Sequence, residues 1–226
     1  MVIWNVVFPS KCEICGKPFV IKDQNLFCSN CLDQIERSFS FFCRSCGVAG
    51  ENSFPLCDRC KKDRMYDYIH SFTSYSKVSQ IIIKFKLSGY KNLSKNIASL
   101  IKKDLLDFVK THNIQTVLYV PISKGTYRKR GFNHLELILR EIVPNFLIKD
   151  WLAKNRDTKL QVELSKEERE KNLTDAFSLK KEAKFYGQNI LVFDDILTTG
   201  STLREIGKLL RTKKVGKIYG YVIAKT

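Results

Sequence analysis

The chain has 226 residues, of which 44% are hydrophobic and 12% aromatic, and its formal net charge is +16. This apolar content is enough to bury a core, which excludes a disordered chain. No apolar run approaches the ~20 residues needed to span a bilayer. The amino terminus has no basic leader and only a short apolar run, so we expect no secretory signal and predict a cytoplasmic protein.

The basic residues are concentrated in the later part of the chain. Residues 1–70 contain nine Lys and Arg against eight Asp and Glu, whereas residues 71–226 contain 30 against 15. A bias of this size indicates an anionic partner, either phosphates or nucleic acid. The alternative is that the excess of basic residues serves only to keep the protein in solution.

All eight cysteines fall into four Cys-x-x-Cys pairs, which are Cys12/Cys15, Cys28/Cys31, Cys43/Cys46 and Cys57/Cys60. Two thiolates at this spacing fit one tight turn, and two such turns complete a tetrahedron around zinc. Gly16 and Gly47 each follow the second cysteine of a pair, where the turn often needs positive φ. We therefore predict two structural zinc ions and assign them no catalysis, because four-thiolate sites have no open position.

Four disulfides are the competing interpretation of the cysteines. Disulfides suit secreted chains, which this one does not resemble, and a redox site would use one pair rather than four. Sequence order places the first four cysteines on one ion and the last four on the other. Spacing alone leaves an interleaved arrangement open.

Beyond the cysteines, buried strands alternate with amphipathic helices. Strands are predicted over residues 66–76, 116–121, 189–194 and 217–225. Helices are predicted over residues 77–90, 92–112, 131–142 and 201–214. This alternation indicates an α/β fold with a parallel sheet flanked by helices. The charged stretch 154–172 is expected to be a loop followed by a short helix.

Residues 190–202 read ILVFDDILTTGST, so two aspartates end a buried strand and a hydroxyl-rich turn opens a helix. Ligands of parallel sheets bind beyond the carboxyl ends of the strands. The N–H groups of a helix start bind anions, and a glycine there allows close approach. A phosphate site beside two carboxylates fits a ribose 5-phosphate. The alternative is a helix capped by Ser201 or Thr202, with solvated aspartates.

The stretch VFDDILTTGST resembles the phosphoribosyl pyrophosphate signature of type I phosphoribosyltransferases. Two further stretches, VPISKGTYRKRGFNHLELI (120–138) and RDTKLQVELSKEEREKNLTDAF (156–177), are similar to segments of the ComF family, as is the eight-cysteine head. The resemblance implies a double zinc ribbon over residues 1–65 and a type I phosphoribosyltransferase fold over residues 66–226. It also implies a link to competence proteins that handle incoming single-stranded DNA.

The resemblance assigns the ligand site residue by residue. Asp194 and Asp195 would hold the ribose hydroxyls, and the 5-phosphate would lie in the turn of Thr198, Thr199, Gly200, Ser201 and Thr202. Mg²⁺ would bridge pyrophosphate and ribose oxygens. Ser123 and Lys124 are expected on the pyrophosphate side. Arg156 and Lys159 could close as a lid, and with Lys124 they are the candidates for catalysis.

The residues expected to contact single-stranded DNA combine positive charge with aromatic neighbours. They are Lys84, Lys86, Tyr90, Arg128, Lys129 and Arg130, and Phe85 and Tyr127 are further candidates for stacking on bases. An exposed basic turn is the alternative for residues 128–130.

Three functions remain in competition. The leading hypothesis is a ComF-type protein that binds phosphoribosyl pyrophosphate and single-stranded DNA during DNA uptake, with other uptake proteins as further partners. An active phosphoribosyltransferase on a small nucleophile is the second. A nucleotide-sensing regulator without catalysis is the third.

Overall fold

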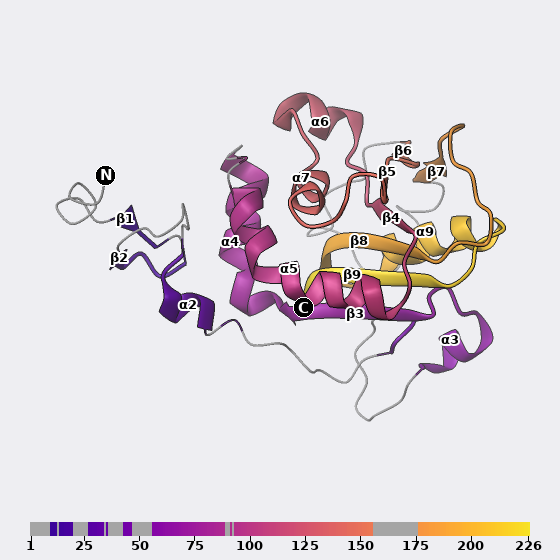
Figure 1. The fold of residues 1–226 in the computed structure, drawn as a ribbon, viewed down its shortest axis with the longest axis horizontal. Helices are drawn as coiled ribbons and strands as arrows, with labels where there is room; N and C mark the ends of the chain where they lie inside the picture. The colour runs from indigo at the N-terminus through magenta and orange to yellow at the C-terminus, as the bar shows by residue number, and fades with distance from the viewer. Residues whose placement is uncertain are drawn as a thin grey trace.

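A five-stranded parallel sheet forms the centre of the later part of the chain (Figure 1). The computed structural model describes residues 10–12, 14–19, 27–33, 35, 43–46, 56–88, 91, 93–155 and 176–226. The strands, in their spatial order, are β3 (Tyr68–Ser74), β9 (Ile218–Lys225), β8 (Ile190–Leu197), β4 (Thr116–Tyr119) and β5 (Ile148–Lys149). The predicted parallel α/β fold is confirmed.

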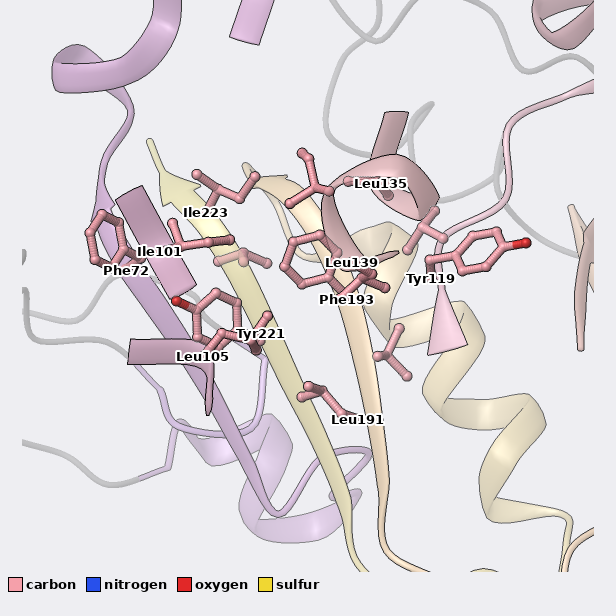
Figure 2. Packing of buried hydrophobic residues seen from close by; sticks show 14 of the residues in the cluster. Phe72, Ile101, Leu105, Tyr119, Leu135, Leu139, Leu191, Phe193, Tyr221 and Ile223 are labelled. Carbon is pink, nitrogen blue, oxygen red and sulfur yellow. The ribbon is translucent and has the colours of Figure 1, made fainter. Parts of the chain in front are cut away.

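The two central strands are the most apolar segments, because both of their faces are covered. Every residue of β9 is buried, and β8 is buried from Ile190 to Phe193. Figure 2 shows Phe193 and Tyr221 side by side between the sheet and its helices, with ring centroids 5.8 Å apart. A strand buried on both faces has the continuous apolar sequence that the pattern predicted.

Helices cover both faces of the sheet. The helices are α4 (Tyr75–Ser88), α5 (Leu93–Thr111), α6 (Lys124–Arg130), α7 (His134–Arg140) and α9 (Ser201–Arg211). Asp104 of α5 accepts hydrogen bonds from Tyr221 of β9 and pairs with His70 of β3, each at 2.8 Å, which holds α5 on those strands. Figures 1 and 2 show α5 in front of the sheet and α9 behind it.

Strand β8 continues beyond the two aspartates that were expected to end it. Its pairing with β9 runs on to Leu197 and Lys225, whereas its pairing with β4 stops at Phe193 and Tyr119. Pro121 follows soon after β4 and has no N–H to donate to a ladder. Asp194 and Asp195 therefore lie where β8 has lost one neighbour but keeps the other.

Smaller elements complete the described residues. They are β1 (Ser10–Lys11), β2 (Pro18–Phe19), α2 (Ser29–Asp33), α3 (Asp58–Lys62), β6 (Leu152–Lys154) and β7 (Phe177–Leu179). The antiparallel β6–β7 pair flanks residues 156–175, so the expected loop and helix over 154–172 lie largely outside the described residues. No helix in the described part of the chain is both long and apolar enough to cross a membrane.

Candidate functional site

The cysteines gather into two groups in sequence order. Within each group the sulfurs lie within 4.8 Å of one another, and the groups are Cys12/Cys15/Cys28/Cys31 and Cys43/Cys46/Cys57/Cys60. All eight are free thiols, so the disulfide interpretation is wrong. The sequential arrangement replaces the interleaved one. Four convergent sulfurs fit a closed tetrahedral zinc site.

The backbone around Cys12 favours the thiolate form that zinc binds. Burial alone would raise the pKa of Cys12, but the N–H groups of Cys15, Cys28 and Ile14 lower it to about 6. Gly16 adopts the predicted positive φ, at 71°, and its N–H donates to the Cys12 carbonyl at 2.8 Å. Gly47 lies outside the described residues.

A pocket lies over the start of α9, where it is lined by Asp194 and residues 196–203. The N-cap of α9 is Gly200, with φ of 73° and no side-chain cap. The alternative interpretation, a helix capped by Ser201 or Thr202, is therefore wrong. The Ser201 and Thr199 hydroxyls lie 2.7 Å apart on the same turn. Ser201 N donates to Thr199 Oγ1 at 3.4 Å, which is a long hydrogen bond. The N–H groups of a helix start beside hydroxyls can bind a phosphate.

The two adjacent aspartates have different surroundings, because successive strand residues point to opposite faces. Asp194 lines the pocket, whereas Asp195 is not among the lining residues. Burial and the neighbouring Asp195 raise the pKa of Asp194 to about 7. Burial alone would also raise the pKa of Asp195, but Lys86 and His134 hold it below its ordinary value.

A buried network surrounds Asp195. Lys86 Nζ lies 2.7 Å from Asp195 Oδ2, and His134 Nε2 lies 2.5 Å from the same oxygen. Arg130 Nη1 lies 3.1 Å from His134 Nδ1. Since an arginine can only donate, His134 accepts at Nδ1 and donates from Nε2 to Asp195. Burial lowers the pKa of His134, in keeping with this neutral form.

Sequence reasoning did not identify His134 as a site residue. Its only signal was its place in the RGFNHLELI stretch, directly after Asn133. Asn133 is the N-cap of α7, since its Oδ1 accepts from Leu135 N at 3.0 Å. The contact of His134 with Asp195 spans 61 positions and has no local pattern.

The proposed pyrophosphate side begins at α6. Ser123 is the N-cap of this helix, and its hydroxyl accepts from Thr126 N at 3.1 Å and donates to Thr126 Oγ1 at 3.0 Å. The Ser123 hydroxyl therefore already caps the start of α6. Lys124 is exposed in the first turn of α6.

Two of the predicted DNA contacts lie beside Asp195, since Lys86 pairs with it directly and Arg130 contacts its partner His134. The basic surface consists of Lys84 and Lys86 on α4 and Arg128, Lys129 and Arg130 on α6. Phe85 and Phe132 hold the two segments together, with ring centroids 6.0 Å apart. Phe85 is only 1% exposed, so its predicted stacking on bases is wrong.

Tyr127, in contrast, is 52% exposed on α6. Three residues of the predicted site lie outside the described part of the chain. They are Tyr90, Arg156 and Lys159.

Comparison with known proteins matches both parts of the chain. Residues 3–63 match the double zinc ribbon domain, and residues 91–225 match the phosphoribosyl transferase domain. Competence protein F of Haemophilus influenzae is 29% identical over 89% of this chain and 91% of its own. DNA utilization protein YhgH of Escherichia coli K12 is 26% identical over 96% and 98%. Competence protein ComFC of Streptococcus pneumoniae is 26% identical over 88% and 93%.

These matches cover nearly the whole chain and agree with the parallel sheet and the two cysteine groups. The chain belongs to the phosphoribosyl transferase domain family and carries a double zinc ribbon ahead of that domain, and it is similar over nearly its whole length to proteins named for competence and DNA utilization.

Proposed function

We propose that this protein binds phosphoribosyl pyrophosphate with Mg²⁺ at the start of α9 and single-stranded DNA on the neighbouring basic surface, as part of DNA uptake. The relatives named for competence and DNA utilization support the setting. The observation that carries the ligand assignment is the pocket that Asp194 shares with the uncapped start of α9.

The pocket offers complementary groups to the two ends of a ribose 5-phosphate. The first turn of α9 provides N–H groups and a positive helix end for the phosphate. Asp194 provides carboxylate oxygens for a hydroxyl or for Mg²⁺ held by the pyrophosphate. The diol role of Asp195 remains part of the proposal, and Lys86 and His134 both contact its Oδ2.

The basic surface supports the DNA part of the proposal. Arg128 and Lys129 are exposed in the last turn of α6, and Tyr127 beside them presents an exposed ring. Cations that neutralise phosphates, together with a ring that stacks on any base, bind single strands without sequence preference.

Calorimetry with phosphoribosyl pyrophosphate and Mg²⁺ tests the ligand site. The Asp194→Asn variant is expected to lose affinity about tenfold or more, because it removes a charged partner. Glu205→Gln is the matched control, since it makes the same charge change in α9, where Glu205 pairs with Lys208 outside the pocket lining. Equal affinity in wild type and Asp194→Asn would remove the assignment.

The same samples distinguish binding from turnover. Release of pyrophosphate in the presence of a nucleobase would favour the transferase that acts on a small nucleophile. Binding without release, together with DNA affinity, is the expected result for the proposed function.

A further inference from the structure

The second cysteine group, Cys43/Cys46/Cys57/Cys60, lies directly against the start of α9. A Cβ atom placed on Gly200 would overlap the carbonyl oxygen of Cys46. Gly200 also has φ of 73°, which favours glycine. The carbonyl oxygen of Cys46 therefore limits the space around Gly200, which is the central residue of the proposed phosphate-binding turn 198–202.

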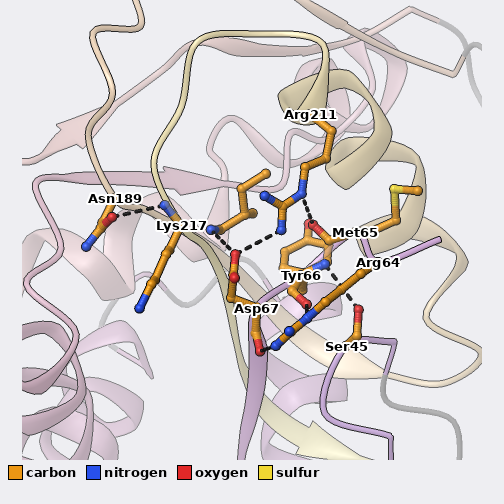
Figure 3. A network of polar contacts seen from close by, with 9 residues as sticks. Ser45, Arg64, Met65, Tyr66, Asp67, Asn189, Arg211 and Lys217 are labelled. Atoms are coloured by element: carbon orange, nitrogen blue, oxygen red, sulfur yellow. Dashed lines mark hydrogen bonds and ion pairs between the residues drawn. The ribbon is translucent and has the colours of Figure 1, made fainter. Parts of the chain in front are cut away.

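This cysteine turn is hydrogen-bonded to the chain that leads into β3. Ile69 N donates to Arg44 O at 2.6 Å. Tyr66 N donates to Ser45 Oγ at 3.2 Å, as Figure 3 shows. Ser45 is fully buried. The turn is thus held at two points rather than resting loosely on the sheet.

The same leading segment holds α9. Tyr66 OH donates to Leu203 O at 2.8 Å, in the first turn of the helix. Arg211 Nε donates to Met65 O at 3.1 Å, and Arg211 Nη2 pairs with Asp67 Oδ2 at 2.8 Å (Figure 3). The second cysteine group, residues 64–69 and α9 are therefore packed as one unit.

The first cysteine group has a different set of contacts. In the part of the chain that the structure describes, its backbone hydrogen bonds join Cys12 to Lys17 and Gly16 and join Cys31 to Cys28, and Cys28 N donates to Cys12 Sγ. These contacts remain inside its own turns. The two groups have the same ligand chemistry but different neighbours, so one can serve as a control for the other.

We propose that metal binding at Cys43/Cys46/Cys57/Cys60 positions the phosphate-binding turn 198–202, through the Cys46 carbonyl and the Ser45–Tyr66–Leu203 connection. The proposal rests on the proposed ligand site and adds a positioning role for the second zinc ribbon. Four thiolates on one ion fix the backbone of the Cys43–Cys46 turn. That fixed backbone holds Gly200 and the first turn of α9 in the conformation that binds a phosphate.

Hydrogen exchange compares Cys57→Ser with Cys15→Ser in the full-length protein. Each variant removes one thiolate from one group, and the metal content of each is measured. In Cys57→Ser, the amides of residues 198–204 are expected to exchange about tenfold faster. The amides of β4 and β8 should stay protected. In Cys15→Ser, residues 198–204 should exchange as in wild type.

A second variant covers the case in which Cys57→Ser unfolds the sheet. Ser45→Ala keeps all eight cysteines and removes the acceptor for Tyr66 N, together with the hydroxyl that hydrogen-bonds to Cys60. It should retain both metals, speed exchange at residues 198–204 and weaken binding of phosphoribosyl pyrophosphate. Unchanged exchange there in Ser45→Ala and in a folded Cys57→Ser would overturn the proposal.

The two readouts separate this proposal from the proposed function. If wild type binds no phosphoribosyl pyrophosphate, the ligand assignment fails, while exchange at residues 198–204 still decides the positioning role. If wild type binds it and loss of the second metal changes neither exchange nor affinity, only the positioning role fails.

Discussion

Lys86 Nζ lies 2.7 Å from Asp195 Oδ2, which joins α4 of the basic surface to the carboxylate pair of β8. The Lys86 side chain is 30% exposed and that of Asp195 is 9% exposed. The Lys86 ammonium group has three N–H donors, so it can hold the buried carboxylate and still offer a donor to an anion from solvent. The proposed ligand site and the proposed DNA contact are therefore joined by one ion pair.

Lys86→Gln should lower the free energy of unfolding by about 1–3 kcal/mol, because it leaves a buried carboxylate with one charged partner fewer. Lys84→Gln makes the same change two residues away, at an exposed position, and should stay within about 0.5 kcal/mol of wild type. Urea unfolding of both variants measures the difference. Equal stability would mean that His134 alone satisfies Asp195.

Asp194 predicts a specific dependence of stability on pH. Burial and Asp195 raise its pKa from 3.8 to about 7. Between these two pH values the folded state holds the proton more often than the unfolded state, so the contribution of Asp194 to stability falls as pH rises toward 7. Above pH 7 that contribution stays lost.

Asn at this position cannot ionise, so Asp194→Asn should gain stability over wild type as pH rises. The difference in unfolding free energy between variant and wild type should be about 1–3 kcal/mol larger at pH 8 than at pH 5. Asp195 is present in both proteins and largely cancels. If the difference in unfolding free energy does not change with pH, the raised pKa of Asp194 is contradicted.

Much of the fold could be predicted because its signals are local. The helix predicted over residues 92–112 is α5 at Leu93–Thr111, and the strand predicted over 217–225 is β9 at Ile218–Lys225. Apolar periodicity and continuous burial determine both. The cysteine groups were likewise predictable, since Cys-x-x-Cys spacing is itself the geometry of the turn.

The sequence identified many of the residues at the site but few of the contacts between them. The turn from Thr198 to Thr202 lies at the start of a helix as expected, yet its cap is glycine rather than a hydroxyl. The pairing of Asp195 with Lys86 joins residues far apart in sequence, so tertiary packing alone creates it. Phe85 was misjudged because its neighbours are lysines, whereas its own position faces the core.

Gly200→Ala and Gly131→Ala isolate the contact with Cys46. Both glycines have positive φ, 73° and 82°, so both variants incur the cost of a left-handed alanine, about 1–2 kcal/mol. A Cβ on Gly131 meets nothing within 4 Å, whereas one on Gly200 overlaps the Cys46 carbonyl. Gly200→Ala should therefore be the less stable variant in thermal unfolding. Equal melting temperatures would show that the Cys43–Cys46 turn moves to accommodate the added methyl group at little cost in stability.

The two cysteine groups predict the metal content of the purified protein. Elemental analysis should find about two zinc ions per chain, because each group supplies four thiolates to one ion. Cys12→Ser should retain about one zinc and leave the start of α9 folded. Loss of both ions in Cys12→Ser would show that the groups do not bind metal independently.

The DNA prediction depends on charge at the end of α6. Arg128→Gln/Lys129→Gln removes two exposed cations and leaves Arg130, which donates to His134, in place. Each phosphate contact to a single strand contributes about 0.7 to the slope of log affinity against log salt, so this pair should reduce the slope by about 1.4. Lys213→Gln/Lys214→Gln makes the same charge change at exposed positions after the far end of α9, and should keep the wild-type slope. Fluorescence anisotropy with a labelled oligonucleotide across a salt series measures the slopes of both double variants. In the same assay, Tyr127→Ala should lose about 1–3 kcal/mol of binding free energy if its ring stacks on a base. If the two double variants have the same slope, the cations at residues 128 and 129 serve solubility, and the proposal that the basic surface binds DNA loses its electrostatic support.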